Sequence, residues 1–196
     1  MHLKKSQLPI FIVNITALLI FAFIFAKRKN HEFMIYIGVI IFFLVLILYT
    51  NKTINYPNSI LWGLTAWSLL HMSGGGIYID GKKLYTLMIY PLVGEPYLIF
   101  KFDQFVHILG FFVATLAVYH LLKPKLIKGH KWTAVSIVVV MAGFGLGALN
   151  EIVEFIATIF APETGVGGYE NTALDLVSNL IGAILAMAYA YAKEKN

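Results

Sequence analysis

Residues 8–26 read LPIFIVNITALLIFAFIFA, and residues 33–50 read FMIYIGVIIFFLVLILYT. Each run holds about 18 or more residues without a charge, and at about 1.5 Å per helical residue it can cross a hydrocarbon core of about 30 Å. A helix in the core of a soluble protein rarely needs this length. These two runs therefore predict an integral membrane protein.

The composition agrees with this prediction. Of the 196 residues, 59% are hydrophobic and 13% are charged, whereas a soluble domain has about 25% charged residues. The chain has no cysteine, which excludes disulfides, thiolate nucleophiles and cysteine-bound zinc. The net charge of +5 comes from short lysine-bearing loops, so we expect membrane lipids as partners and no nucleic acid.

Hydropathy predicts an all-α fold, a six-helix transmembrane bundle that forms a single integral membrane domain over residues 1–196. The spans are expected at about 8–26, 33–50, 59–73, 98–122, 132–160 and 172–192. The first span follows MHLKK but ends in KRKN instead of a small-residue cleavage site, so we expect it to be retained.

Two connections carry turn signals. The glycines at 74–76 lower helix propensity, so the chain is expected to leave the third helix there, or to form an anion-binding nest with Ser73. Asp80 and Gly81 then lie between two β-prone runs, which predicts a short extracytoplasmic hairpin over Ile77–Tyr85 with a type I′ turn. Residues 161–171, APETGVGGYEN, are predicted to form a loop.

Lysine and arginine positions predict the orientation. Most of them lie at the two termini and in the loops 51–58 and 123–131, which an even number of spans places on one side. The positive-inside rule therefore predicts a cell-membrane protein with both termini in the cytoplasm, although residues 27–29, KRK, fall on the opposite side. The lysines of the 123–131 loop are interpreted as a solvated group facing anionic lipid.

Polar side chains gather at the ends of four predicted spans. They are His71, Asp103, His107, Asn150, Glu151, Glu154, Asn171, Asp175 and Asn179. Because successive spans alternate in direction, all of them lie toward one membrane face, which the predicted orientation makes extracytoplasmic. Spacings of i,i+3 and i,i+4 give each helix one polar stripe. A charge at mid-span costs roughly 2.5 to 3.5 kcal/mol, so we expect these side chains to meet in a buried polar pocket.

Four of these residues are the predicted catalytic groups. Glu151 and Glu154 share one helical face in an apolar setting, so they should repel each other and leave a proton available for transfer. Asp103 lies one turn before His107 and could hold its imidazole as a general base. Alternatively, Asp103 is simply exposed at the lipid head groups.

The other five residues are predicted to bind substrate. They are His71, Asn150, Asn171, Asp175 and Asn179. Three of them also have a structural interpretation. Asp175 with Thr172 resembles a capping box, and Asn179 could bond between helices. His71 could instead lie at the membrane interface beside Trp67.

A divalent metal is a further candidate. The available nitrogen and oxygen ligands suit zinc, manganese or iron, and they are His71, His107, Glu151, Glu154 and Asp175. No HExxH or comparable spacing occurs within one helix. The cofactor and the metal ligands are therefore left unassigned.

Four short motifs resemble the YjdF family of bacterial multi-pass inner-membrane proteins. They are HMSGGG at His71–Gly76, DQFVHILG at Asp103–Gly110, EIVEF at Glu151–Phe155 and NTALD at Asn171–Asp175. Asn171 stands where that pattern has an acid, and the loop from Gly165 to Tyr169 lacks an expected aspartate. DLVSNLIG at Asp175–Gly182 is more distantly similar to the VanZ-like family, whose members are associated with glycopeptide-antibiotic resistance. The resemblance implies a fold and a site, because no firm activity attaches to the YjdF family.

Three functions fit these patterns. The first is an enzyme that modifies a lipid or lipid-linked substrate, with Glu151 or Glu154 as proton donor and His107 as base. The second is a proton- or cation-coupled binding or transport protein, in which the carboxyl pair takes up the ion. The third is a non-catalytic envelope component whose polar cluster only holds helices together.

Overall fold

The computed structural model describes residues 3–161, 164 and 167–195, and the chain divides into two compact units. The first unit comprises Met1–Leu87 and Glu154–Val166, and the second comprises Met88–Val153 and Gly167–Asn196. The single domain expected over residues 1–196 stays a prediction.

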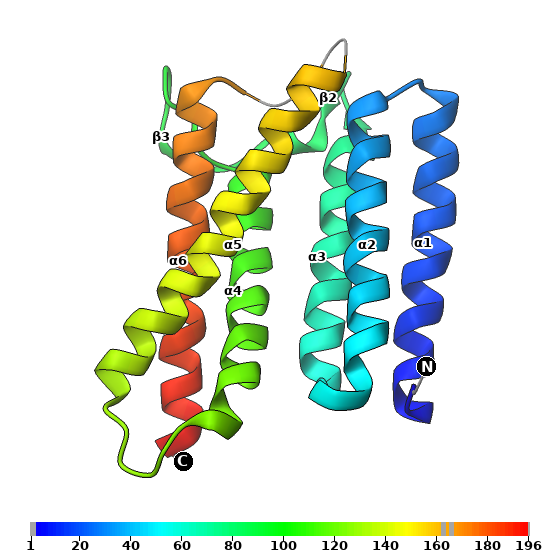
Figure 1. The fold of residues 1–196 in the computed structure, drawn as a ribbon. Helices are drawn as coiled ribbons and strands as arrows, with labels where there is room; N and C mark the ends of the chain where they lie inside the picture. The colour runs from blue at the N-terminus through cyan, green and yellow to red at the C-terminus, as the bar shows by residue number, and fades with distance from the viewer. Residues whose placement is uncertain (1–2, 162–163, 165–166, 196) are drawn as a thin grey trace. The chain divides into compact units, whose positions relative to one another are not determined.

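Three long helices, α1 (Leu8–Lys27), α2 (His31–Ile54) and α3 (Asn58–Gly76), form the first unit after a 3-10 turn, η1, at Lys5–Gln7. They lie side by side and alternate in direction (Figure 1). Asn30 caps α2 by accepting a hydrogen bond from the backbone N–H of Phe33 at 3.1 Å. Asn55, in the left-handed region at φ 56°, ends the same helix.

The glycines of the HMSGGG motif form the last turn of α3, so the chain leaves the helix at this motif, as predicted, but after Gly76 and not after residue 73. All three are buried, and a Cβ at Gly75 would collide with the ring of Phe33, just as one at Gly74 would collide with Tyr85. The helix ends after Gly76, whose carbonyl accepts a hydrogen bond from Arg28 Nη1 at 2.6 Å. Aromatic packing therefore explains these glycines, and it overrides their low helix propensity.

The predicted hairpin is confirmed. Strands β1 (Tyr78–Ile79) and β2 (Lys82–Lys83) pair antiparallel and precede a 3-10 turn, η2, at Leu84–Thr86. Asp80 and Gly81 both have positive φ, 49° and 77°, which is the backbone geometry of a type I′ turn.

A second small sheet belongs to the second unit and was not predicted. Strands β3 (Met88–Val93) and β4 (Ile99–Lys101) pair antiparallel with a register irregularity between them. The all-α description is therefore approximate. The fourth helix begins at residue 102 instead of 98, because the residues before it pair as a strand.

The second unit contains α4 (Phe102–Leu122), a 3-10 turn, η3, at Lys123–Lys125, and the helices α5 (Trp132–Phe160) and α6 (Tyr169–Lys195). The residues of α5 up to Val153 belong to this unit. Helices α4 and α6 run in the same direction (Figure 1). They approach closely at Gly182, where a Cβ would lie 2.9 Å from the backbone nitrogen of Phe112. This small residue is what allows the two helices to pack backbone against backbone.

Apolar side chains pack together near the C-terminal ends of α4 and α6. Tyr119, Val135, Val139, Met187 and Ala190 form one buried cluster there. Where α5 crosses α4 and α6 nearer the middle, Gly143 packs on Thr115 and Gly147 packs on Asn179. Most buried polar side chains of this unit lie instead near the end where α4 and α6 begin.

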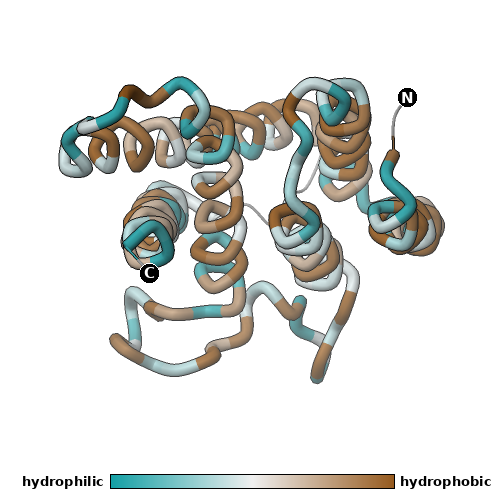
Figure 2. Tube along the Cα trace, turned by 90° about the horizontal axis from the view of Figure 1, so that it is seen from below, coloured by the Kyte–Doolittle hydropathy of each residue, from teal (hydrophilic) through white to brown (hydrophobic). Residues whose placement is uncertain are grey.

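Five of the described helices are long and apolar enough to cross a membrane, namely α1, α2, α4, α5 and α6. Figure 2 shows apolar residues along most of the length of these helices. The six-span prediction is therefore supported for five spans. Helix α3 falls short because Asn58, Ser68, His71 and its glycines dilute its apolar residues.

The loop predicted over residues 161–171 lies partly outside the described residues, and so does most of the segment from Gly165 to Tyr169. Within the described part, α6 begins at Tyr169, earlier than the predicted residue 172. Because of this shift, Asp175 lies inside α6 and not at its start.

Candidate functional site

A glutamine organises the corner between β4 and α4. Gln104 Oε1 accepts hydrogen bonds from the backbone N–H groups of Phe100 at 2.6 Å and Lys101 at 2.8 Å. The bond to Lys101, the N-cap residue of α4, satisfies a donor that the helix start leaves unpaired, and the bond to Phe100 ties the end of β4 to the helix. The corner thereby places Asp103 in the first turn of α4 and His107 one turn further on.

His107 is buried and linked to both neighbouring helices. Its Nδ1 lies 2.9 Å from Asn179 Oδ1 on α6 and 3.6 Å from Glu151 Oε1 on α5. Asn179 in turn donates from Nδ2 to Glu151 Oε1 at 3.4 Å. Because an amide oxygen can only accept, Nδ1 of a neutral His107 carries the proton and Nε2 keeps its lone pair. We call His107, Asn179 and Glu151 the imidazole relay.

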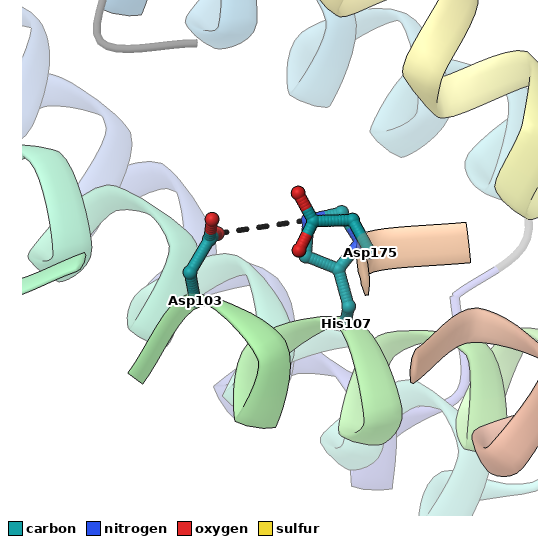
Figure 3. A group of neighbouring side chains, drawn as sticks. All are labelled: Asp103, His107 and Asp175. Atoms are coloured by element: carbon teal, nitrogen blue, oxygen red, sulfur yellow. Dashed lines mark ion pairs between the residues drawn. The ribbon is translucent and has the colours of Figure 1, made fainter. Parts of the chain in front are cut away.

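Two aspartates lie close to the same imidazole. Nε2 of His107 lies 3.6 Å from Asp103 Oδ1. Asp175 comes from α6, and Figure 3 shows its carboxyl group beside the imidazole ring. The ligand atoms of Asp103, His107 and Asp175 all lie within 4.8 Å of one another. We call these three residues the carboxylate–imidazole cluster.

Asn171 joins the two aspartates to a lysine. Its Nδ2 donates to Asp175 Oδ2 at 2.5 Å and approaches Asp103 Oδ2 at 3.4 Å. Its Oδ1 accepts a hydrogen bond from Lys101 Nζ at 3.3 Å. Asn171 therefore contacts the Oδ2 atom of each carboxylate, which we call the outer oxygen. It also places the Lys101 ammonium group at the edge of the cluster.

A cavity of about 420 Å³ adjoins this edge. Its lining includes Lys101 and Asn171, together with Tyr97, Leu98, Tyr169 and Leu174. Of the nine predicted site residues, Asn171 alone lines this cavity, and the carboxylate–imidazole cluster is reached from it through Asn171. The predicted polar pocket thus corresponds to a buried cluster with a separate cavity beside it.

Six of the predicted residues meet in this way. They are Asp103, His107, Glu151, Asn171, Asp175 and Asn179. Asn150 is half-buried on α5, and its side chain hydrogen-bonds that of Glu151. The involvement of Asn150 in substrate binding stays a prediction.

Two predicted residues belong to the first unit. Glu154 lies at the point of α5 where the residues group with that unit, and its role as a proton donor stays a prediction. His71 is buried on α3, where its Nδ1 lies 2.6 Å from Tyr85 Oη and its ring stacks on Trp67. Substrate binding by His71 likewise stays a prediction, while its expected proximity to Trp67 is confirmed.

The capping interpretation of Asp175 is wrong. Since α6 begins at Tyr169, Asp175 lies in the second turn, and its side chain is 0% exposed. Helix-capping groups act at the first turn. The interhelical role of Asn179 is confirmed by its contacts with His107 and Glu151.

Sequence reasoning missed Lys101 and Gln104. Lys101 carries no spacing signal of its own, and Gln104 is an ordinary helix residue until the strand before it is known. A useful signal was available, because Lys101, Asp103 and Gln104 form one polar group directly before an apolar run.

The comparisons with known proteins identify the family. The family model described as Predicted membrane protein (DUF2238) matches residues 8–196, so the chain belongs to this family. YjdF is a member of it, which confirms the YjdF resemblance at the level of the family. No curated protein and no solved structure matches the chain. The VanZ-like resemblance stays a prediction.

Proposed function

We propose that this DUF2238 family member acts as an enzyme on the polar head of a lipid or lipid-linked substrate. The observation that carries the proposal is the buried imidazole relay, connected through Asp103, Asn171 and Lys101 to a cavity of about 420 Å³. The positive-inside pattern favours an extracytoplasmic position for this site.

The cavity suits the head of an amphiphile. Its volume lies within the range of about 300 to 1,000 Å³ found for small-molecule sites. Lys101 supplies a positive charge for a phosphate or carboxylate group. Tyr97 and Tyr169 are exposed, as is typical of aromatic residues at head-group level. Leu98 and Leu174 supply apolar wall beside them.

The relay supports acid–base chemistry. With its Nδ1 proton donated to Asn179, His107 can accept a proton at Nε2 from a water or hydroxyl group. The imidazolium that forms has Asp103 at 3.6 Å from Nε2 and Glu151 at 3.6 Å from Nδ1. These two carboxylates stabilise the positive charge and hold the ring in place. The imidazolium can return this proton from Nε2 to a leaving group, and Glu151, when protonated, is the candidate donor of a second proton.

Coupled transport receives less support. Most buried polar residues of the second unit lie near the end where α4 and α6 begin, and the apolar cluster around Tyr119 and Val139 fills the interior near the other end. A transport route confined to this unit would have to cross that packing. The non-catalytic alternative predicts a different outcome in the experiment below, because polar residues that only hold helices together are needed for assembly.

The experiment uses the full chain reconstituted in vesicles of phosphatidylethanolamine, phosphatidylglycerol and a polyprenyl phosphate. Mass spectrometry follows changes in the head groups over time. His107→Gln removes the base, and His120→Gln, in the last turn of the same helix, is the control. A general base contributes about 10²- to 10⁴-fold, so we expect product formation to fall by about that factor in His107→Gln alone.

Thermal unfolding of both variants in detergent separates chemistry from assembly. If His107→Gln unfolds like the wild type and forms no product, the proposal is supported. If the wild type changes none of these head groups, or if His107→Gln is as active as His120→Gln, the proposal is wrong. Loss of folding in His107→Gln together with an inactive wild type would favour the non-catalytic role.

A further inference from the structure

We infer that Asp103, His107 and Asp175 form a binding site for one divalent transition-metal cation, with Asn171 orienting both carboxylates from outside. This inference rests on the proposed function in placing the reaction centre in the same cluster, but it assigns Nε2 of His107 to the ion, so that with the ion bound Glu151 replaces His107 as the group that exchanges protons. The binding itself can be measured without any lipid substrate.

The geometry is close to that of a coordination shell. Two ligands that are each about 2.1 Å from a tetrahedral metal lie roughly 3.4 Å apart. His107 Nε2 and Asp103 Oδ1 are 3.6 Å apart, and a ligand atom of Asp175 lies within 4.8 Å of both residues' ligand atoms. Figure 3 shows the three side chains converging from α4 and α6.

A second, independent observation points to a ligand. Asp175 is 0% exposed, and within the described part of the chain its Oδ1 has no hydrogen-bond partner. The other oxygen, Oδ2, is satisfied by Asn171. A buried carboxylate oxygen without a partner is costly, and a cation shared with His107 Nε2 would satisfy it.

The surrounding groups are arranged as outer-shell partners. Metal-bound histidines usually donate their second ring nitrogen to an oxygen, which orients the ring. Here Nδ1 of His107 is paired with Asn179 Oδ1. Asn171 donates to both aspartates through their outer oxygens, leaving Asp103 Oδ1 and Asp175 Oδ1 for the ion.

The charge balance also favours a divalent cation. Three carboxyl groups, those of Asp103, Glu151 and Asp175, interact with one another in a largely buried region, and Lys101 is the cation that acts on Asp175. A divalent cation would relieve the repulsion among these carboxyl groups.

The donor set indicates the class of metal. One imidazole nitrogen and two carboxylate oxygens suit Zn²⁺ or Mn²⁺, and they exclude metals that require thiolate ligands. Three protein ligands leave coordination positions open, as in catalytic sites. A cation there would polarise an oxygen of the substrate head group. His107 would then act as a ligand, and Glu151 would remain as the group that exchanges protons.

The experiment measures Mn²⁺ and Zn²⁺ binding to the full-length protein in detergent after chelator treatment, by electron paramagnetic resonance for Mn²⁺ and by calorimetry and elemental analysis for Zn²⁺. We expect one ion per chain. Asp175→Asn removes one ligand, and Glu194→Gln on the same helix is the control. Since even outer-shell changes cost about 10- to 100-fold in affinity, Asp175→Asn should weaken binding by at least about that much, and Glu194→Gln should not.

A spectroscopic measurement on the wild type keeps the test valid if Asp175→Asn does not fold. Electron spin echo modulation of bound Mn²⁺ should show one coupled imidazole nitrogen, which His107→Gln removes and His120→Gln leaves in place. The inference is overturned if the wild type binds neither ion, if Asp175→Asn is folded and binds as tightly as Glu194→Gln, or if no imidazole nitrogen is coupled. If the protein binds the metal but changes none of the lipid head groups, the proposed function is wrong and the metal-binding inference stands.

Discussion

Replacing Gly182 by alanine should drive α4 and α6 apart, because the new methyl group would meet backbone instead of a movable side chain. The nearest atoms are the carbonyl group of Ile108 and, at 2.9 Å, the backbone nitrogen of Phe112. Neither can rotate away without shifting α4. His107 precedes Ile108 directly, so the same shift would separate His107 from its partners on α6.

The expected magnitude combines two effects of opposite sign. An alanine in a helix interior is favoured over glycine by about 0.5 to 1 kcal/mol. Overpacking a filled contact costs about 1 to 3 kcal/mol, and the upper part of that range applies when the obstacle is backbone. The Gly182→Ala protein should therefore be less stable than the wild type by about 1 to 2 kcal/mol.

Gly145 on α5 provides the matched control. Among the described residues, no atom outside its own helix and chain neighbours lies within 4 Å of the position that a Cβ would occupy. Gly145→Ala should therefore gain the helix propensity without a clash, and it should be neutral or stabilising by up to about 1 kcal/mol.

The assay is reversible unfolding in mixed micelles, followed by circular dichroism. Cation affinity provides a second readout, since separation of α4 from α6 moves Asp175 away from His107 and should weaken binding. If Gly182→Ala is as stable as Gly145→Ala and binds the cation like the wild type, the backbone contact between α4 and α6 is not as tight as described, and the reasoning is refuted.

Two further substitutions test other contacts. Asn14→Leu removes the 2.7 Å hydrogen bond from Asn14 Nδ2 to Thr65 Oγ1, which links α1 to α3. Unfolding in mixed micelles should show that the free energy of unfolding falls by about 0.6 to 1.7 kcal/mol. An unchanged unfolding midpoint would mean that the bond contributes nothing to stability. Gln104→Ala removes the acceptor of two backbone N–H groups just before α4, those of Phe100 and Lys101. Amide hydrogen exchange at these two residues should therefore become faster. If both amides stay protected, another group accepts their hydrogen bonds.

Most helix positions were predictable from local sequence. The α5 bounds match the predicted span of residues 132–160, because a long apolar run in lipid must satisfy its backbone hydrogen bonds internally and can do so only as a helix or a closed barrel. The Asp80–Gly81 turn was predictable for a similar reason. Both residues accept positive φ, so the hairpin is encoded in two adjacent positions.

The errors arose where distant residues decide local structure. Gly74 and Gly75 continue α3 because the rings of Tyr85 and Phe33 occupy the space beside them. Strands β3 and β4 are stabilised by pairing with each other, and residues 94–98 separate them in the sequence. Neither effect can be seen in a window of neighbouring residues, since the stabilising partner lies elsewhere in the chain.

The candidate site shows the same division. Helical spacing was enough to predict that Asp103 and His107 share a face, since an α-helix brings residues four positions apart together. Only the packing of α4 alongside α6, at a distance that Gly182 permits, brings Asp175 to the same imidazole. Local hydropathy thus determined that the chain enters a membrane and where it is helical. Side-chain contacts between helices decided which acids meet His107, because those contacts depend on register and close approach, which hydropathy does not encode.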